Sequence, residues 1–95
     1  MTDQDLARRL RMLFRTVRML ETELRHGQLD EELLQSIDQQ LEHGIATASR
    51  AMGLRPLVDA LRESTITPRA ELHGDTIRAC EQLMDAIETI ALGLR

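Results

Sequence analysis

Three histidines and one cysteine are the side chains of this sequence that could act as nucleophiles, bases or soft metal ligands: His26, His43, His73 and Cys80. No two of the histidines have a spacing that would place two metal ligands on one face of a helix. The sequence also contains no glycine-rich phosphate loop and no Gly-x-Ser-x-Gly nucleophile motif. We therefore expect no metal site, no cofactor and no ordinary hydrolase or nucleotide-dependent enzyme.

Cys80 is the chain's one cysteine, so no intrachain disulfide can form. It falls among the apolar positions of the last predicted helix, where a small buried hydrophobic side chain is the favoured interpretation. The acidic start of the sequence lacks the pattern of a signal peptide, and no apolar run approaches the length of a membrane span. These features predict a cytoplasmic protein that does not interact with a membrane.

Helical periodicity runs through the whole sequence of 95 residues, and glycine and proline interrupt it at only a few places. Helices are predicted over residues 3–26 and 30–53, over a short stretch beginning near Pro56, and from Thr67-Pro68 to the end. Asp30 is a candidate N-cap, and Gly27 a candidate C-terminal cap. The chain is therefore predicted to be all-α, a single domain built as an antiparallel up-and-down bundle of three long helices and one short helix.

The predicted core consists of the apolar residues that recur on one face of each helix. In the first helix these are Leu6, Leu10, Leu13, Val17, Leu20 and Leu24, and in the second Leu34, Ile37, Leu41, Ile45, Ala48 and Met52. The short helix contributes Leu57, Val58 and Leu61, and the last helix Leu72, Thr76, Cys80, Leu83, Ile87, Ile90 and Leu94.

His43 stands apart from the other two histidines, because the helical wheel places it opposite the apolar stripe of the second helix. A side chain there would project into solvent from the middle of a helix. The face around it is polar and mostly uncharged, and is made of Ser36, Gln39, Gln40, Ala46, Thr47 and Arg50. An exposed neutral imidazole is a competent nucleophile, so His43 is a candidate phosphoacceptor; the alternative is an ordinary surface histidine.

The sequence from Leu41 to Glu63 resembles the histidine-containing phosphotransfer domain of two-component phosphorelays. Positions that fit the family pattern after the histidine are Ile45, Ala48, Ser49, Gly53 and Leu57. The resemblance implies a helical bundle in which His43 accepts a phosphoryl group from a receiver domain. Where the family has lysine and glycine, this chain has Ala46 and Thr47, and Arg50 is one helical turn further on. The resemblance therefore also allows a variant that binds a receiver without transferring phosphate.

Charge is distributed unevenly along the chain. Residues 1–27 contain six arginines and four acids, whereas residues 28–95 contain six arginines and twelve acids, for a total charge of −4. The wheel gathers five arginines on the outer face of the first helix: Arg8, Arg11, Arg15, Arg18 and Arg25. This face either binds an acidic partner or phosphate, or is a solvated surface neutralised by the acidic helices. The acidic balance and the single aromatic residue argue against nucleic-acid binding.

Met12 and Met19 lie seven residues apart on the outer side of the same helix. Two methionines in this arrangement indicate a second apolar seam for a partner helix or a homodimer, unless they are isolated exposed side chains. Two functions therefore stay open. One is a phosphotransfer or receiver-binding module, a phosphotransfer intermediary rather than an enzyme. The other is a non-catalytic dimeric regulator that binds a protein such as a transcription factor through its first helix. A metal-responsive or small-molecule-responsive repressor ranks last.

Overall fold

The computed structural model describes residues 2–45, 48–66 and 73–94, and all regular structure in these ranges is helical. The elements in chain order are α1 (Asp3–Arg25), α2 (Glu31–Gln40), the π-turn η1 (Leu41–Ile45), the 3-10 turn η2 (Ser49–Ala51), α3 (Leu54–Ser64) and α4 (His73–Leu92). Within the described ranges there is no strand, so the all-α prediction is confirmed. None of the described helices is apolar over a stretch long enough to cross a membrane.

The first helix forms where the sequence predicts it, and its ends are closed by local hydrogen bonds. At the start, the Thr2 hydroxyl accepts from the Asp5 amide at 3.1 Å. At the end, Gly27 adopts φ +81, and the Gln28 amide donates to the Glu23 carbonyl at 2.9 Å. This pattern is a glycine C-cap of the Schellman type. All six apolar residues predicted to face the core are buried.

The second predicted helix is shorter than expected. Asp30 caps it as predicted, because its carboxylate accepts from the Glu32 and Leu33 amides at 2.9 and 3.3 Å. The helix then ends at Gln40 instead of continuing to residue 53. The backbone leaves the helical region at His43 and Gly44, the latter with φ +139.

This break overturns two expectations. The structure has two long helices, α1 with 23 residues and α4 with 20, and two short ones, α2 with 10 and α3 with 11. The predicted composition of three long helices and one short helix is therefore wrong. Met52, predicted to lie in the core, is 68% exposed, because it follows the break and no longer shares a face with Ile37 and Leu41.

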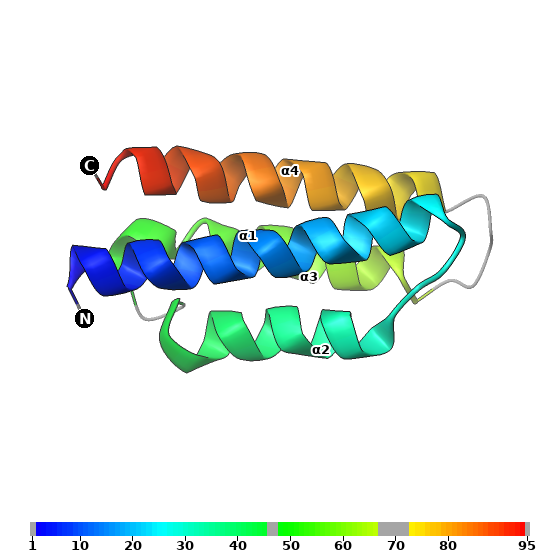
Figure 1. The fold of residues 1–95 in the computed structure, drawn as a ribbon, viewed down its shortest axis with the longest axis horizontal. Helices are drawn as coiled ribbons and strands as arrows, with labels where there is room; N and C mark the ends of the chain where they lie inside the picture. The colour runs from blue at the N-terminus through cyan, green and yellow to red at the C-terminus, as the bar shows by residue number, and fades with distance from the viewer. Residues whose placement is uncertain (1, 46–47, 67–72, 95) are drawn as a thin grey trace.

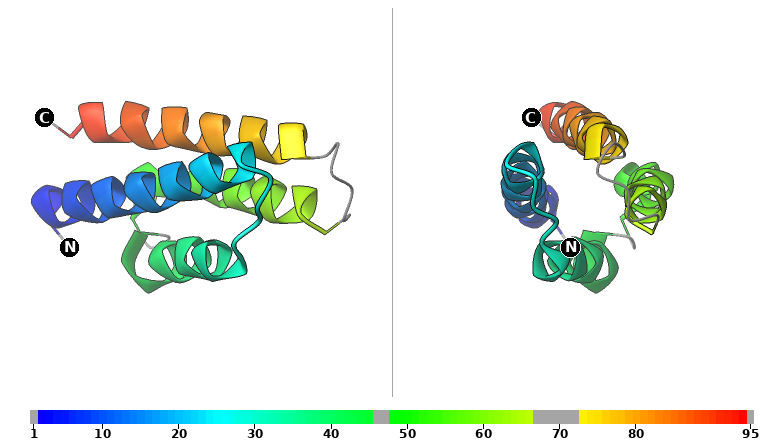
Figure 2. Two further views of the ribbon diagram at one scale, coloured as in Figure 1. Left: turned by 45° about the vertical axis from the view of Figure 1, so that its right-hand side comes forward. Right: turned by 90° about the vertical axis from the view of Figure 1, so that its right-hand side faces the viewer.

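The four helices surround one apolar core (Figures 1 and 2). α1 packs against both α4 and α2, and α3 packs against α4. Polar contacts join the neighbours at the edges of the core: Gln40 donates to the Thr16 hydroxyl at 2.8 Å, and Ser64 donates to the Thr76 hydroxyl at 3.0 Å. Figure 1 shows that α1 begins and α4 ends at the same end of the molecule. The predicted cap and start of the last helix, Thr67-Pro68, lie outside the described residues, as does Leu72.

Candidate functional site

His43 is exposed, as predicted, but it is not in the middle of a helix. It lies within η1 with φ −95 and ψ +46, so its carbonyl is not directed along a continuing helix. The carbonyl is hydrogen-bonded by a side chain of α1, because the Arg9 guanidinium donates to the His43 carbonyl oxygen at 3.0 Å. The position of His43 is therefore set by a contact between α1 and the turn after α2.

Gly44 makes that contact possible. A Cβ atom at this position would lie 2.7 Å from Nη1 and 2.9 Å from Cζ of Arg9, and the φ of +139 is one that residues with side chains rarely adopt. Glycine thus serves both the turn and the close approach of the guanidinium. A glycine directly after His43 is the sequence signal for this turn, but the predicted helix over residues 30–53 continued through it.

The other residues predicted to surround His43 are only partly brought together. Gln39 is exposed on the last turn of α2, and the half-buried Gln40 donates to Ser36 at 3.0 Å. Arg50 belongs to η2 and forms an ion pair with Asp3 at 3.6 Å, so it does not follow His43 on the same helix. Ala46 and Thr47, the two positions that depart from the phosphotransfer pattern, lie outside the described residues.

His26 does not belong to a metal centre within the part of the chain that the structure describes. Glu23 and His26 have the Glu-x-x-His spacing of helical di-iron proteins, which the sequence analysis missed. However, Nδ1 of His26 lies 2.8 Å from the Thr22 carbonyl of its own helix. Desolvation, and then the neighbouring Asp30 carboxylate, raise the pKa of Glu23. Among the described residues no three His, Cys, Asp or Glu side chains are grouped as metal ligands.

Cys80 is fully buried, as expected, on the inner face of α4. Burial, followed by the charges of Glu21 and Glu81, raises the pKa of its thiol to about 12. Both effects disfavour the thiolate, which is the reactive form of cysteine. The interpretation of Cys80 as a core residue without nucleophilic function is therefore supported.

The arginine face of α1 divides into two groups. Two members of the predicted set have counter-charges: Arg8 pairs with Asp5 at 3.9 Å, and Arg25 pairs with Glu81 of α4 at 3.0 Å. The other three, Arg11, Arg15 and Arg18, are exposed and form no ion pair with any described residue.

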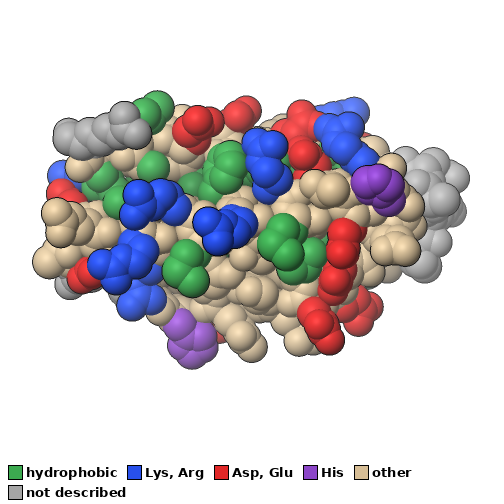
Figure 3. All heavy atoms as spheres, viewed as in Figure 1, with side chains coloured by type: hydrophobic (Ala, Val, Ile, Leu, Met, Phe, Trp, Pro, Cys, Tyr) green, Lys and Arg blue, Asp and Glu red, His purple; other side chains and the backbone are tan. Residues whose placement is uncertain are grey.

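The guanidinium of Arg18 stands over the Phe14 ring, 5.3 Å from its centre. Figure 3 shows blue arginine side chains gathered over α1, with green apolar groups between them. Within the described ranges, no acidic side chain lies within ion-pair distance of the three arginines in the central part of this face.

Both methionines predicted to form a seam are exposed, Met12 at 57% and Met19 at 50%. They belong to the outer side of α1 and leave about half of their surface in contact with water. Met12 also borders a small hollow of about 60 Å³ together with Arg9, Gln40 and Ile45, beside the turn that holds His43. The structure thus places Met12 between the arginine face and the His43 turn.

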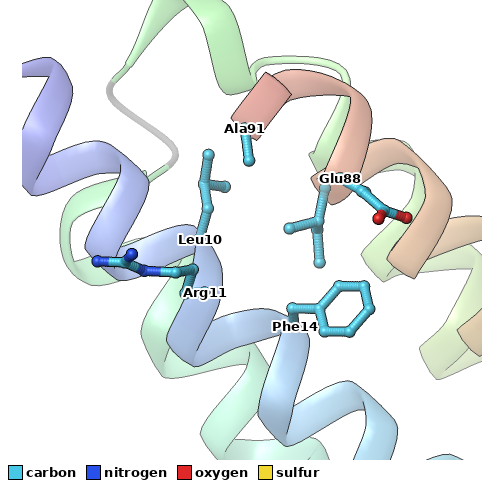
Figure 4. A pocket seen from close by; sticks show the side chains of 6 residues that line it. Leu10, Arg11, Phe14, Glu88 and Ala91 are labelled. Atoms are coloured by element: carbon cyan, nitrogen blue, oxygen red, sulfur yellow. The ribbon is translucent and has the colours of Figure 1, made fainter. Parts of the chain in front are cut away.

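An apolar cleft between α1 and α4 was not predicted. Leu10 and Phe14 of α1 face Ile87 and Ala91 of α4 across a volume of about 180 Å³, with Arg11 and Glu88 at its edges (Figure 4). Phe14 is only partly buried and packs against the edge of the core. The available signal was Phe14 itself, the chain's one aromatic residue, placed beside the core stripe of its helix.

Comparisons with known proteins give no match: no family model, no curated protein and no solved structure is significantly similar to this chain.

Proposed function

We propose that this protein is a non-catalytic interaction module, an antiparallel up-and-down helical bundle that binds an acidic protein surface with the outward face of α1. The observation that carries the proposal is a set of three exposed arginines, Arg11, Arg15 and Arg18, that form no ion pair with a described residue, beside two half-exposed methionines. The antiparallel arrangement is supported by contacts between α1 and α4. Arg25 at the end of α1 pairs with Glu81, whereas Leu10 near its start faces Ala91.

The composition of this face fits one kind of partner. Guanidinium groups form bidentate hydrogen bonds to carboxylates, which favours Asp and Glu on the opposing surface. Methionine side chains adapt to differently shaped apolar groups and are common where a helix is bound. An amphipathic helix with leucines on one side and glutamates along its edges would satisfy both Arg15 and the two methionines. Such a helix could belong to a receiver domain or to a transcription regulator.

The chemistry of the rest of the molecule agrees with binding rather than catalysis. The one thiol is buried, and its pKa is raised away from the range in which thiolates form. The exposed His43 has no acidic or basic side chain bonded to its ring among the described residues. Nucleophilic side chains in enzymes are commonly activated or oriented by such a neighbour.

A synthetic amphipathic helix tests this proposal directly. The probe is a fluorescent peptide with a leucine stripe flanked by glutamates, and the matched control peptide has lysines in place of the glutamates. We expect the acidic peptide to bind and the basic peptide not to bind at low ionic strength. Reversing one charge with Arg15→Glu should weaken binding about tenfold, and this difference should shrink in 0.5 M salt.

Two variants separate the parts of the face. Met19→Glu should also weaken binding of the acidic peptide, because it adds a like charge and removes apolar contact. Arg78→Glu is the matched control, since Arg78 is an exposed arginine of α4 that pairs with Asp75 at 3.6 Å. Equal affinities for wild type, Arg15→Glu and Met19→Glu, or equal binding of both peptides, would overturn the proposal.

A second function, phosphate acceptance at His43, is favoured by one specific observation. The imidazole is exposed, and the cationic Arg9 lies against the backbone of the same residue. Acid-labile label transferred from phosphorylated receiver domains would reveal this activity. It should vanish in His43→Gln and persist in His26→Gln, which changes another exposed histidine. Absence of label in the folded wild-type protein, with every receiver of the panel, would leave binding as the function.

A further inference from the structure

The cleft between α1 and α4 has rims of opposite charge. On the α1 side stands Arg11, and on the α4 side stands Glu88, both exposed and without an ion pair among the described residues. Figure 4 shows the Arg11 guanidinium and the Glu88 carboxylate pointing away from each other, outward from the two sides of the cleft. Between them lie only apolar side chains.

Further along the same pair of helices, opposite charges do meet within one molecule. Arg25 of α1 reaches Glu81 of α4 at 3.0 Å. At the cleft this pairing does not occur, because Phe14 and Leu10 separate the two rims. The cleft region therefore presents an apolar strip with a cation, Arg11, on one side and an anion, Glu88, on the other.

We propose that a second copy of this chain covers the cleft, in a two-fold symmetric dimer in which Arg11 of each protomer pairs with the partner's Glu88. A two-fold axis brings the same patch of both copies together, so each contact occurs twice. A surface with a cation and an anion on opposite sides of an apolar strip is complementary to itself under this rotation. An acidic helix of another protein would instead meet Glu88 and be repelled by it.

The dimensions of the molecule permit such a dimer. The principal extents are 40 × 19 × 19 Å, so the projected area of one whole long side is of the same order as the roughly 800 Å² per partner buried in a stable complex. Phe14 is the natural apolar anchor at its centre, since aromatic residues are enriched in the buried middle of interfaces. Arg11 also belongs to the proposed acidic-partner face, so a dimer would remove Arg11 from that face and leave Arg15 and the exposed methionines for the partner.

Sedimentation equilibrium on the full chain tests the dimer. We expect wild-type protein to sediment at twice the 10.8 kDa mass of one chain. Arg11→Glu places Glu opposite the partner's Glu88 at both symmetric contacts, and Glu88→Arg places Arg opposite Arg11. Each variant should raise the dimer dissociation constant about 100-fold or more, because two attractive contacts become repulsive.

Mixing the two variants is the decisive step. In a mixed dimer the Glu at position 11 of one chain meets the Arg at position 88 of the other, and the native Glu88 of the first meets the native Arg11 of the second. Both contacts are again complementary, so two proteins that are monomeric alone should form a heterodimer, which native mass spectrometry with one isotope-labelled chain identifies. Arg78→Glu, outside the cleft, should leave the wild-type mass unchanged.

Several outcomes would overturn this inference. They are a wild-type monomer at 100 µM, dimers that persist in both charge variants, and folded variants that fail to associate when mixed. A monomer that binds a small apolar probe such as 1-anilinonaphthalene-8-sulfonate in the cleft would assign the cleft to a ligand instead. The two tests can be told apart. Affinity for the acidic peptide is measured in variants of Arg15 and Met19, whereas the mass in solution is measured in variants of Arg11 and Glu88.

Discussion

The stability of this protein above pH 9 should depend on one buried thiol. The sequence contains no lysine and no tyrosine, so Cys80 is its one side chain that titrates between pH 9 and the range of arginine. Burial first, and then the carboxylates of Glu21 and Glu81, raise the thiol pKa in the folded protein from 9.0 to about 12. The folded protein therefore keeps a proton that the unfolded chain releases above pH 9.

The sign and size of the effect follow from this difference. The stabilisation is fully present below the unfolded pKa and is lost as pH rises towards the folded pKa. At pH 11 the unfolded thiol is two pH units above its pKa of 9.0, whereas the folded thiol is still mostly protonated. The free energy of unfolding should therefore be lower at pH 11 than at pH 8 by roughly 2–3 kcal/mol.

Urea unfolding followed by circular dichroism at pH 8, 9, 10 and 11, under reducing conditions, measures this loss. Cys80→Ala is the matched control, since it is less stable at pH 8 because of the cavity but has no thiol to titrate. Its free energy of unfolding should stay nearly constant over the same range. Parallel curves for wild type and Cys80→Ala would refute the assignment of the pH dependence to a buried thiol.

Two further substitutions test how the turn around His43 and the start of α2 are held. Gly44→Ala should lower the free energy of unfolding by about 1–3 kcal/mol in chemical denaturation, because it forces a positive φ on alanine and displaces the Arg9 guanidinium. In the Arg9→Ala background, Gly44→Ala should cost less stability, because the guanidinium that the new methyl group would displace is absent. If Gly44→Ala costs the same with and without Arg9, the close contact between Gly44 and Arg9 is contradicted. Asp30→Ala removes two hydrogen bonds from the start of α2 and should lower the melting temperature through a loss of about 1 kcal/mol, whereas Asp30→Asn should retain most of the stability.

Local signals predicted the parts of the fold that local interactions determine. The apolar stripe of α1 is buried at all six expected positions, since a 3.6-residue period fixes which side chains share a face. Asp30 caps the start of α2 and Gly27 the end of α1, as expected, because capping depends on the few residues around each cap. The burial of Cys80 follows from the same periodicity in α4.

The break after α2 was not predicted, because an interaction between distant residues supports it. Arg9, 34 positions earlier in the chain, binds the carbonyl of His43 and occupies the space that a side chain at position 44 would need. Periodicity alone continues smoothly through Leu41 and Ile45, both of which are buried even though the helix between them is broken. Glycine next to histidine was the one local indication, and helix propensity treats a single glycine as tolerable.

The ion-pair partners of the arginines could not be predicted from the sequence either. The helical wheel predicted that five arginines share one face of α1. The packing of α4 then decides that Arg25 pairs with Glu81, while Arg11 forms no ion pair with a described residue. The spacing of the arginines along α1 does not indicate which acidic side chain of another helix comes within 4 Å of each of them. The division of the arginine face into paired and unpaired members is therefore a property of the tertiary structure.

The overall charge of −4 would argue against an acidic partner, but charge acts on a partner over a limited range. At physiological ionic strength the screening length is about 8 Å, whereas the molecule is 40 Å long and 19 Å wide. A surface that approaches Arg15 and Met19 therefore responds mainly to the cations around it and little to the acids on the far side. As salt is reduced and the screening length approaches the width of the molecule, the distant acids should be felt as well. As the salt concentration falls, the affinity for an acidic helix should therefore increase less than expected from the three unpaired arginines alone, because the distant acids also repel the helix.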